Sequence, residues 1–218
     1  MVTFPLGDRP LKLAMLGMTE GNGHPYSWSI MVNGSYDADA LARCPYAVIR
    51  DYIAKQPPET LGIAGTQVTH VWTEDPPDAV QVAAVAHIPN IAGRAEDVIG
   101  EVDAVLIATD IGHQHVDRAR PFVEAGLPVF IDKPLCDNRA DLAQFSDWVA
   151  AGHPILSSSA MRYAKEFAPY HRRTHEFGAL RHINMTMAKK WETYGIHALE
   201  TILPITGPGF ETIRNTGT

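Results

Sequence analysis

The sequence has only two cysteines, Cys44 and Cys136, in 218 residues. Two cysteines cannot build a framework of several disulfides or a zinc site made of cysteine ligands. Clusters of Lys and Arg are also lacking, and the formal net charge is −7 at pH 7, so we expect no nucleic-acid partner. The longest apolar runs, such as 102–109, are far too short to cross a bilayer, and we expect no membrane partner.

The first residues, MVTFPLGDRPLKLAML, lack the basic-then-apolar order of a secretory signal. Hydrophobic residues make up 45% of the chain and charged residues 20%, which are ordinary values for a globular protein. The length suits one large domain, or one domain and part of a second. We therefore expect a cytoplasmic enzyme or binding protein.

Apolar runs alternate with stretches of helical periodicity over about the first 160 residues. Runs that suit strands buried on both faces occur at 11–16, 68–72, 102–109, 127–131 and 154–159. Stretches with a helical apolar stripe occur at 46–55, 115–125 and 138–150, and Pro121 should kink or shorten the second one. This order predicts βαβ units and an α/β fold, a doubly wound (Rossmann) parallel sheet with helices on both faces.

After residue 160 the pattern changes. Residues 162–177 are polar and predict a helix, and residues 179–188 alternate in part, as a strand does. So short a segment is marginal for an independent core. We expect a dinucleotide-binding domain over residues 1–160 and the start of an incomplete α+β domain for substrate and oligomer contacts over residues 161–218.

The loop after the first expected strand contains three glycines, Gly17, Gly21 and Gly23. A dinucleotide-binding fold needs glycines here, so that the backbone can approach a pyrophosphate at a helix N-terminus. Together with Met18 and Thr19, they are candidate cofactor-binding residues. Their spacing is GxxxGxG instead of GxGxxG, and a plain flexible turn fits the motif about equally well.

Two acids, Glu74 and Asp75, follow the second expected strand. A dinucleotide-binding fold places an acid at this point to bind the ribose 2′-hydroxyl. The usual interval from the glycine loop is about 20 residues, so residues 29–67 would be an insertion. Acids before a Pro-Pro turn are also common on surfaces, and that alternative stays open.

The third expected strand is followed by His113, His115 and Asp117. His-x-His-x-Asp after a buried strand begins the metal site of some binuclear zinc hydrolases. Arg118 occupies the place where those enzymes carry a further His, and the other histidines form no clear pattern. A metallohydrolase is therefore our third hypothesis, and we expect no metal.

The segment 102–135, VDAVLIATDIGHQHVDRARPFVEAGLPVFIDKPL, resembles the Gfo/Idh/MocA family of NAD(P)-dependent oxidoreductases. The family pattern is a strand ending Ala-Thr, a His, a helix ending Glu-Ala-Gly and a strand ending Glu-Lys-Pro. The matching segments are Ala108-Thr109, His115, Glu124-Ala125-Gly126 and Asp132-Lys133-Pro134. The similarity continues into Met161-Arg162-Tyr163, and Gly195-Ile196-His197 is similar to the family's GxH segment.

The resemblance implies two catalytic residues. Lys133 would lie close to the nicotinamide and the substrate hydroxyl, where its charge favours alkoxide character as hydride leaves. His197 would accept or donate the proton. The expected substrate-binding residues are Lys133, Arg162 and His197. The expected cofactor-binding residues are Gly17, Met18, Thr19, Gly21, Gly23, Glu74, Asp75, Ala108, Thr109, Asp110, His115, Asp132, Lys133 and Pro134.

Four features depart from the family pattern. The glycine loop has an unusual spacing, Asp132 replaces the common Glu, and Thr193 occupies a position that often holds an acid four residues before the catalytic His. The large sheet of the family's second domain, which forms a wall of the substrate site and often the oligomer interface, barely begins in this chain.

The sequence therefore predicts a dehydrogenase. It would transfer a hydride between NAD or NADP and a carbinol carbon of a sugar, polyol or related small metabolite. NAD is slightly favoured, because a carboxylate at position 74 or 75 repels a 2′-phosphate. The sequence leaves open whether the chain forms a homo-oligomer. The alternative is a non-catalytic nucleotide-binding or sensing protein that keeps the family fold.

Overall fold

The computed structural model describes residues 9–171, 173–214 and 216. The chain divides into two compact units, one ending at Ser157 and the other beginning at Ser158. Among the described residues, none of the helices has the length and apolar character needed to cross a membrane.

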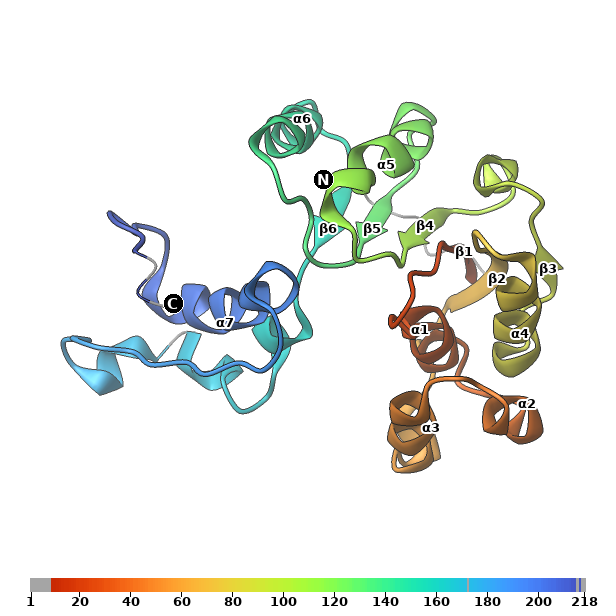
Figure 1. The fold of residues 1–218 in the computed structure, drawn as a ribbon, viewed down its shortest axis with the longest axis horizontal. Coiled ribbons are helices and arrows are strands. Elements are labelled where there is room, and N and C mark those ends of the chain that lie inside the picture. Colours follow the sequence, from red (N-terminus) through yellow and green to blue (C-terminus); the bar gives the residue numbers. More distant parts are fainter. Residues whose placement is uncertain (1–8, 172, 215, 217–218) are drawn as a thin grey trace. The chain divides into compact units, whose positions relative to one another are not determined.

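The first unit is built around a parallel sheet of six strands (Figure 1). The strands are β1 (Leu11–Leu16), β2 (Thr66–Trp72), β3 (Asn90–Ile91), β4 (Ala104–Ile107), β5 (Val129–Ile131) and β6 (Ile155–Ser157). Their order is β3-β2-β1-β4-β5-β6, and every neighbouring pair is parallel. The predicted doubly wound sheet is confirmed, and its strand order reverses between β1 and β4.

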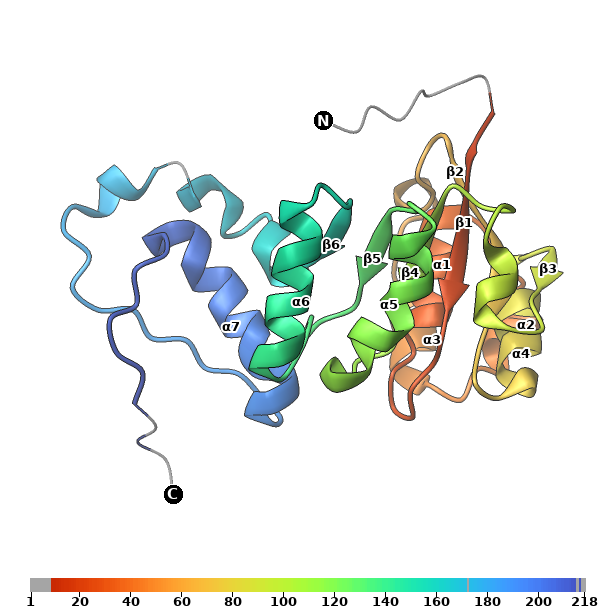
Figure 2. The ribbon, with the colours of Figure 1, turned by 90° about the horizontal axis from the view of Figure 1, so that it is seen from above.

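Helices cover both faces of this sheet. They are α1 (His24–Asn33), α2 (Ala38–Ala42), α3 (Ala47–Ala54), α4 (Pro76–Ala86), α5 (His115–Glu124) and α6 (Arg139–Ala150). In Figures 1 and 2, α5 and α6 lie on one face, and α1 and α4 lie on the other, with α2 and α3 beyond them. The helix α5 runs through Pro121 to Glu124, so of the two expected effects, a kink or a shorter helix, the proline does not end the helix.

The residues of β1 alternate between two cores. Met15 is fully buried in one cluster with Tyr26 and Ile30 of α1. Leu16 is buried in the other cluster with Phe122 of α5. Successive side chains of a strand point to opposite faces, so the buried part of a strand covered on both faces is apolar, here Ala14–Leu16. This explains why the run LKLAML predicts β1 with its observed bounds.

The second unit contains the helix α7 (Trp191–Thr206) and three single 3₁₀ turns, Ala160–Tyr163, Ala168–His171 and Thr174–Phe177. The predicted helix over 162–177 is wrong, because only separate turns form there and Pro169 cannot donate a backbone hydrogen bond. The predicted strand at 179–188 is also wrong. In the described part of this unit no strand pairs with that segment, and an isolated strand leaves its backbone groups without partners.

Candidate cofactor and catalytic site

The sequence-predicted residues of the first unit gather at one edge of the sheet. The glycine loop follows β1, Glu74 and Asp75 follow β2, residues 108–110 follow β4, and residues 132–134 follow β5. Since all strands are parallel, their carboxyl ends meet at the same edge. Doubly wound sheets bind ligands there, at the point between β1 and β4 where the strand order reverses.

Gly17 lies where this edge is most crowded. Its φ of +81° is in the left-handed region, which favours glycine. A Cβ at this position would lie 2.7 Å from Cγ2 of Thr109 and 3.3 Å from the side chains of Glu74 and Arg118. Any other residue would push the loop after β1 away from the end of β4. Gly17 is therefore required by the packing as well as by the backbone.

The other two glycines have different surroundings. Gly21 also has a φ of +81°, with nothing within 4 Å of a Cβ placed there, so side-chain space beside it is open. At Gly23 a Cβ would lie 2.8 Å from Ile49 and 3.1 Å from Tyr46. This glycine lets α1 begin close to α3, and that contact explains its position in the loop.

Glu74 contacts the glycine loop directly, whereas Asp75 makes no cap hydrogen bond at the start of α4. One carboxylate oxygen of Glu74 accepts the N–H of Met18 at 2.8 Å. The other lies 2.5 Å from Nη1 of Arg118, whose remaining nitrogens donate to Oε1 of Gln114. Of the two acids, Glu74 is the one placed to meet a ligand at the loop.

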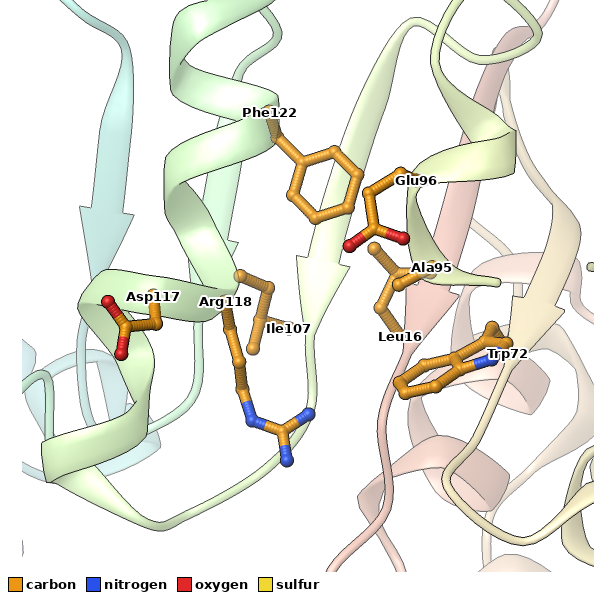
Figure 3. Close-up of a pocket in the computed structure, with 8 residues that line it drawn as sticks. All are labelled: Leu16, Trp72, Ala95, Glu96, Ile107, Asp117, Arg118 and Phe122. Carbon is orange, nitrogen blue, oxygen red and sulfur yellow. The ribbon is translucent and has the colours of Figure 1, made fainter. Parts of the chain in front are cut away.

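A cavity of about 240 Å³ lies between the ends of β1, β2 and β4 and the helix α5 (Figure 3). Its walls are mainly apolar, with Trp72 and Phe122 on opposite sides and Arg118 extending along one edge. The sequence analysis missed Trp72 and Arg118 as site residues. Trp72 is the last residue of β2. Its position at the carboxyl end of a parallel strand could have marked it as a site residue.

The segment Asp132-Lys133-Pro134 follows β5, and its first two residues are buried. Asp132 is 1% exposed and Lys133 is 7% exposed. Oδ1 of Asp132 accepts the N–H of Lys133 at 2.7 Å and lies 3.9 Å from its Nζ. The Lys133–Pro134 peptide bond is cis. Lys133 is thus a buried cation beside a buried carboxylate at the carboxyl end of β5.

His113, His115 and Asp117 have separate surroundings. His115 is fully buried, with Nδ1 3.0 Å from the carbonyl oxygen of Leu135 and Nε2 3.0 Å from that of Thr109. It joins the loop after β4 to the loop after β5. His113 is exposed and bonds Asp137, whose pKa is lowered mainly by that hydrogen bond. No three His, Cys, Asp or Glu side chains form a metal-binding group in the part of the chain that the structure describes.

In the second unit, α7 carries His197. Its Nδ1 lies 2.6 Å from Oγ of Ser159, which also accepts the N–H of Met161. Arg162 donates a hydrogen bond to Glu200, one turn after His197 on α7, and this ion pair raises the pKa of Arg162. Two expected substrate-binding residues, Arg162 and His197, are thus held at the contact between the turn 160–163 and α7.

The fold and this sheet edge together define a Rossmann-type nucleotide-binding protein. The model of the Gfo/Idh/MocA family, described as an oxidoreductase family with an NAD-binding Rossmann fold, matches residues 47–158. This match covers more than half of the chain, and the chain belongs to that family. The match begins after the glycine loop, which is the part with unusual spacing.

Curated relatives agree with this assignment. Inositol 2-dehydrogenase 1 of Saccharopolyspora erythraea is 36% identical over 108 residues, which are 47% of this chain and 32% of the relative. An oxidoreductase subunit of Amycolatopsis mediterranei is 27% identical over 120 residues, 55% of this chain and 33% of the relative. The chain spans about a third of the length of these relatives.

Solved structures share the fold. GenD2 from gentamicin A biosynthesis, in complex with NAD, superposes with a TM-score of 0.62 at 15% identity, covering 91% of this chain and 54% of that one. Myo-inositol 2-dehydrogenase from Lactobacillus plantarum gives a TM-score of 0.51 at 18% identity, covering 78% and 42%. At these identities the likeness concerns the fold alone.

The described residues fit a nicotinamide dinucleotide, with one restriction. Oγ1 of Thr19 is buried and has no hydrogen-bond partner among the described residues, which suits a ligand oxygen at the glycine loop. The apolar cavity beside Trp72 suits a planar base. However, the N–H of His24 is already bonded to Asn22, and Pro25 has no N–H. The start of α1 therefore offers a pyrophosphate fewer donors than usual.

Proposed function

We propose that this chain is the cofactor-binding part of a dehydrogenase that moves a hydride between a nicotinamide dinucleotide and a carbinol carbon. The observation that carries the proposal is Lys133, a buried cation held by Asp132 at the carboxyl end of β5. This edge of a doubly wound sheet is where its ligands bind. The family match, which includes this segment, supports the same chemistry.

Each residue has a defined part in the proposal. When bound, the nicotinamide would supply the hydride acceptor or donor. Lys133 would hold the substrate oxygen and stabilise the negative charge that develops on it. His197, oriented by Ser159, would take the proton of the substrate hydroxyl during oxidation and return it during reduction. Arg162 would bind the substrate beside His197.

The cofactor would lie along the carboxyl ends of β1, β2 and β4. The base would occupy the cavity between Trp72 and Phe122, and the ribose hydroxyls would meet Glu74. A carboxylate at that position repels a 2′-phosphate, which favours NAD over NADP. We assign the other cofactor contacts to residues of the loops after β1 and β4, namely Gly17, Met18, Thr19, Gly21, Gly23, Ala108, Thr109 and Asp110.

For the substrate we propose a small cyclic polyol or sugar. The support is the relative from Saccharopolyspora erythraea, which is named an inositol dehydrogenase and shares 36% identity over the matched residues. Such substrates carry many similar hydroxyls, so selection among them would depend on the side chains that contact the substrate.

A dehydrogenase assay tests this proposal. The chain is incubated with NAD and a panel of inositols, aldoses and nucleotide sugars, and NADH formation is followed by absorbance. We expect Lys133→Ala to lower turnover by about a hundredfold or more, since it removes a group that stabilises developing charge. The matched control is Lys55→Ala, at the exposed end of α3. Equal turnover in wild type and Lys133→Ala would contradict the assigned role.

A further inference from the structure

The carboxylate of Asp132 is held from several directions although only 1% of the residue is exposed. A buried carboxylate is costly unless hydrogen bonds and opposite charge compensate it. Its two oxygens have different partners. Oδ1 faces Lys133, whose N–H and Nζ lie 2.7 Å and 3.9 Å away. Oδ2 faces the loop after β1.

His24, the first residue of α1, holds Oδ2 with Nδ1 at a distance of 2.6 Å. A carboxylate can only accept, so the hydrogen atom must be on Nδ1 and Nε2 is directed away from Asp132. The imidazole also stacks on Trp28, with 4.6 Å between the ring centroids and 12° between the planes. Trp28 in turn meets Phe130 of β5 edge-on. The ring of His24 is therefore fixed on two sides.

Asn22 makes a second connection from the same loop. Its amide nitrogen donates to Oδ2 of Asp132 at 3.0 Å and to the carbonyl oxygen of Ala108 at 3.1 Å. Its amide oxygen accepts the N–H of His24 at 3.0 Å. Asn22 is 6% exposed, and the two bonds that its amide nitrogen donates are buried. The glycine loop is thus tied to the ends of β4 and β5 by side chains.

We propose that His24 and Asn22 are positioning residues for Lys133 and act on it through Asp132. They fix Oδ2, so that Oδ1 keeps one orientation toward the N–H and the ammonium group of Lys133. This gives Asn22 and His24, which lie in and directly after the glycine loop, a physical role. The inference rests on the proposed function, since it concerns the lysine assigned to the substrate oxygen.

The test observes Lys133 directly in the chain without cofactor. The chain contains six lysines, so lysine labelled with carbon-13 gives few ε-methylene NMR signals, and Lys133→Arg assigns the signal of Lys133. We expect His24→Ala to move this signal toward those of the exposed lysines. His24→Asn should return it to within a linewidth of its original position, because the Asn amide reaches the place of Nδ1. His24→Gln should not, because its amide reaches the place of Nε2.

The controls separate positioning from stability. His87→Asn changes an exposed histidine with a left-handed φ of 54°, a conformation that Asn tolerates, and it should leave the Lys133 signal unchanged. A purely structural role for His24 would lower the unfolding temperature and leave the Lys133 signal in place, and that result would overturn the proposal. If His24→Ala does not fold, the comparison of His24→Asn with His24→Gln decides alone, and equal signals in those two variants would overturn it.

NADH titration of the same samples distinguishes this proposal from the proposed function. If His24→Ala moves the Lys133 signal but the wild-type chain does not bind NADH, the result would support the positioning network and contradict the dehydrogenase. If His24→Ala leaves the Lys133 signal in place and the wild-type chain binds NADH and turns over substrate, the result would contradict the network alone.

Discussion

Glu74 at the end of β2 and Arg118 on α5 form an ion pair beside Gly17, with 2.5 Å between Oε1 and Nη1. The pair lies at the edge of the cavity that Trp72 lines. A carboxylate there suits a ribose 2′-hydroxyl, whereas a guanidinium suits a 2′-phosphate. In the proposed function, these two bonded side chains would decide between NAD and NADP.

We predict that Glu74→Ser shifts the preference toward NADPH. The substitution removes the negative charge and releases Arg118 from its ion pair. The ratio of the NADPH to the NADH dissociation constant should fall by about tenfold or more, equivalent to about 1.4 kcal/mol. Fluorescence titration with both cofactors measures this ratio. Glu59→Ser, at an exposed acid of the 3₁₀ turn Pro58–Thr60, is the control, and an unchanged ratio in Glu74→Ser would show that Glu74 does not meet the ribose.

A second prediction concerns Gly17. Gly17 and Gly126 both have left-handed φ values, +81° and +76°, but only Gly17 has neighbours in the way of a Cβ. Alanine at either position should cost about 1 kcal/mol through the backbone. Gly17→Ala should lose about 1–3 kcal/mol more through overpacking against Thr109. Urea unfolding of both variants measures the difference, and equal losses would mean that the contact with Thr109 relaxes at no cost.

A third prediction concerns stability in acid. Asp103 accepts hydrogen bonds from Arg9 and from the N–H of Lys12, and the Arg9 bond is the main reason that its pKa is lowered to about 2. A pKa below the unfolded-state value means that this carboxylate stabilises the fold above about pH 4 and loses that effect as the pH falls toward 2.

Asp103→Asn should therefore lower the unfolding temperature near neutral pH, and the difference from wild type should shrink as the pH falls from about 4 to about 2. Asp147→Asn, on the exposed side of α6, is the control and should show no such convergence. Thermal melts at a series of pH values make the comparison. A difference between Asp103→Asn and wild type that stays constant down to pH 2 would contradict the assigned cause.

Much of the fold could be predicted because the buried parts of strands covered on both faces are mainly apolar. This pattern gave β1 its observed bounds, and it located β2, β4, β5 and β6. The helix α4 was missed because Asp75-Pro76-Pro77 looked like a turn, whereas Pro76 is the first residue of that helix. The strand β3 has two residues, too few to show any periodicity.

The site was predicted where residues follow parallel strands, because that topology alone brings Gly17, Glu74 and Lys133 to one edge. His24 was missed as a partner of Asp132, since 108 positions separate them and neither residue type signals the other. The sequence singled out Arg118 only because it occupies a position where binuclear zinc hydrolases carry a His. Its pairing with Glu74 depends on how α5 packs against β4 and β5, and no motif in the sequence encodes that packing.

The central claim is that this edge of the sheet binds a nicotinamide dinucleotide, and NADH titration of the 218-residue chain tests it most directly. Energy transfer from tryptophan to NADH reports binding. Trp72 lines the cavity, so the Trp72→Phe variant shows whether NADH binds beside it. We predict saturable binding with a dissociation constant below about 1 mM, the upper end of common KM values, and a smaller transfer signal in Trp72→Phe. The absence of saturable binding, or saturable binding with undiminished transfer in Trp72→Phe, would contradict the account.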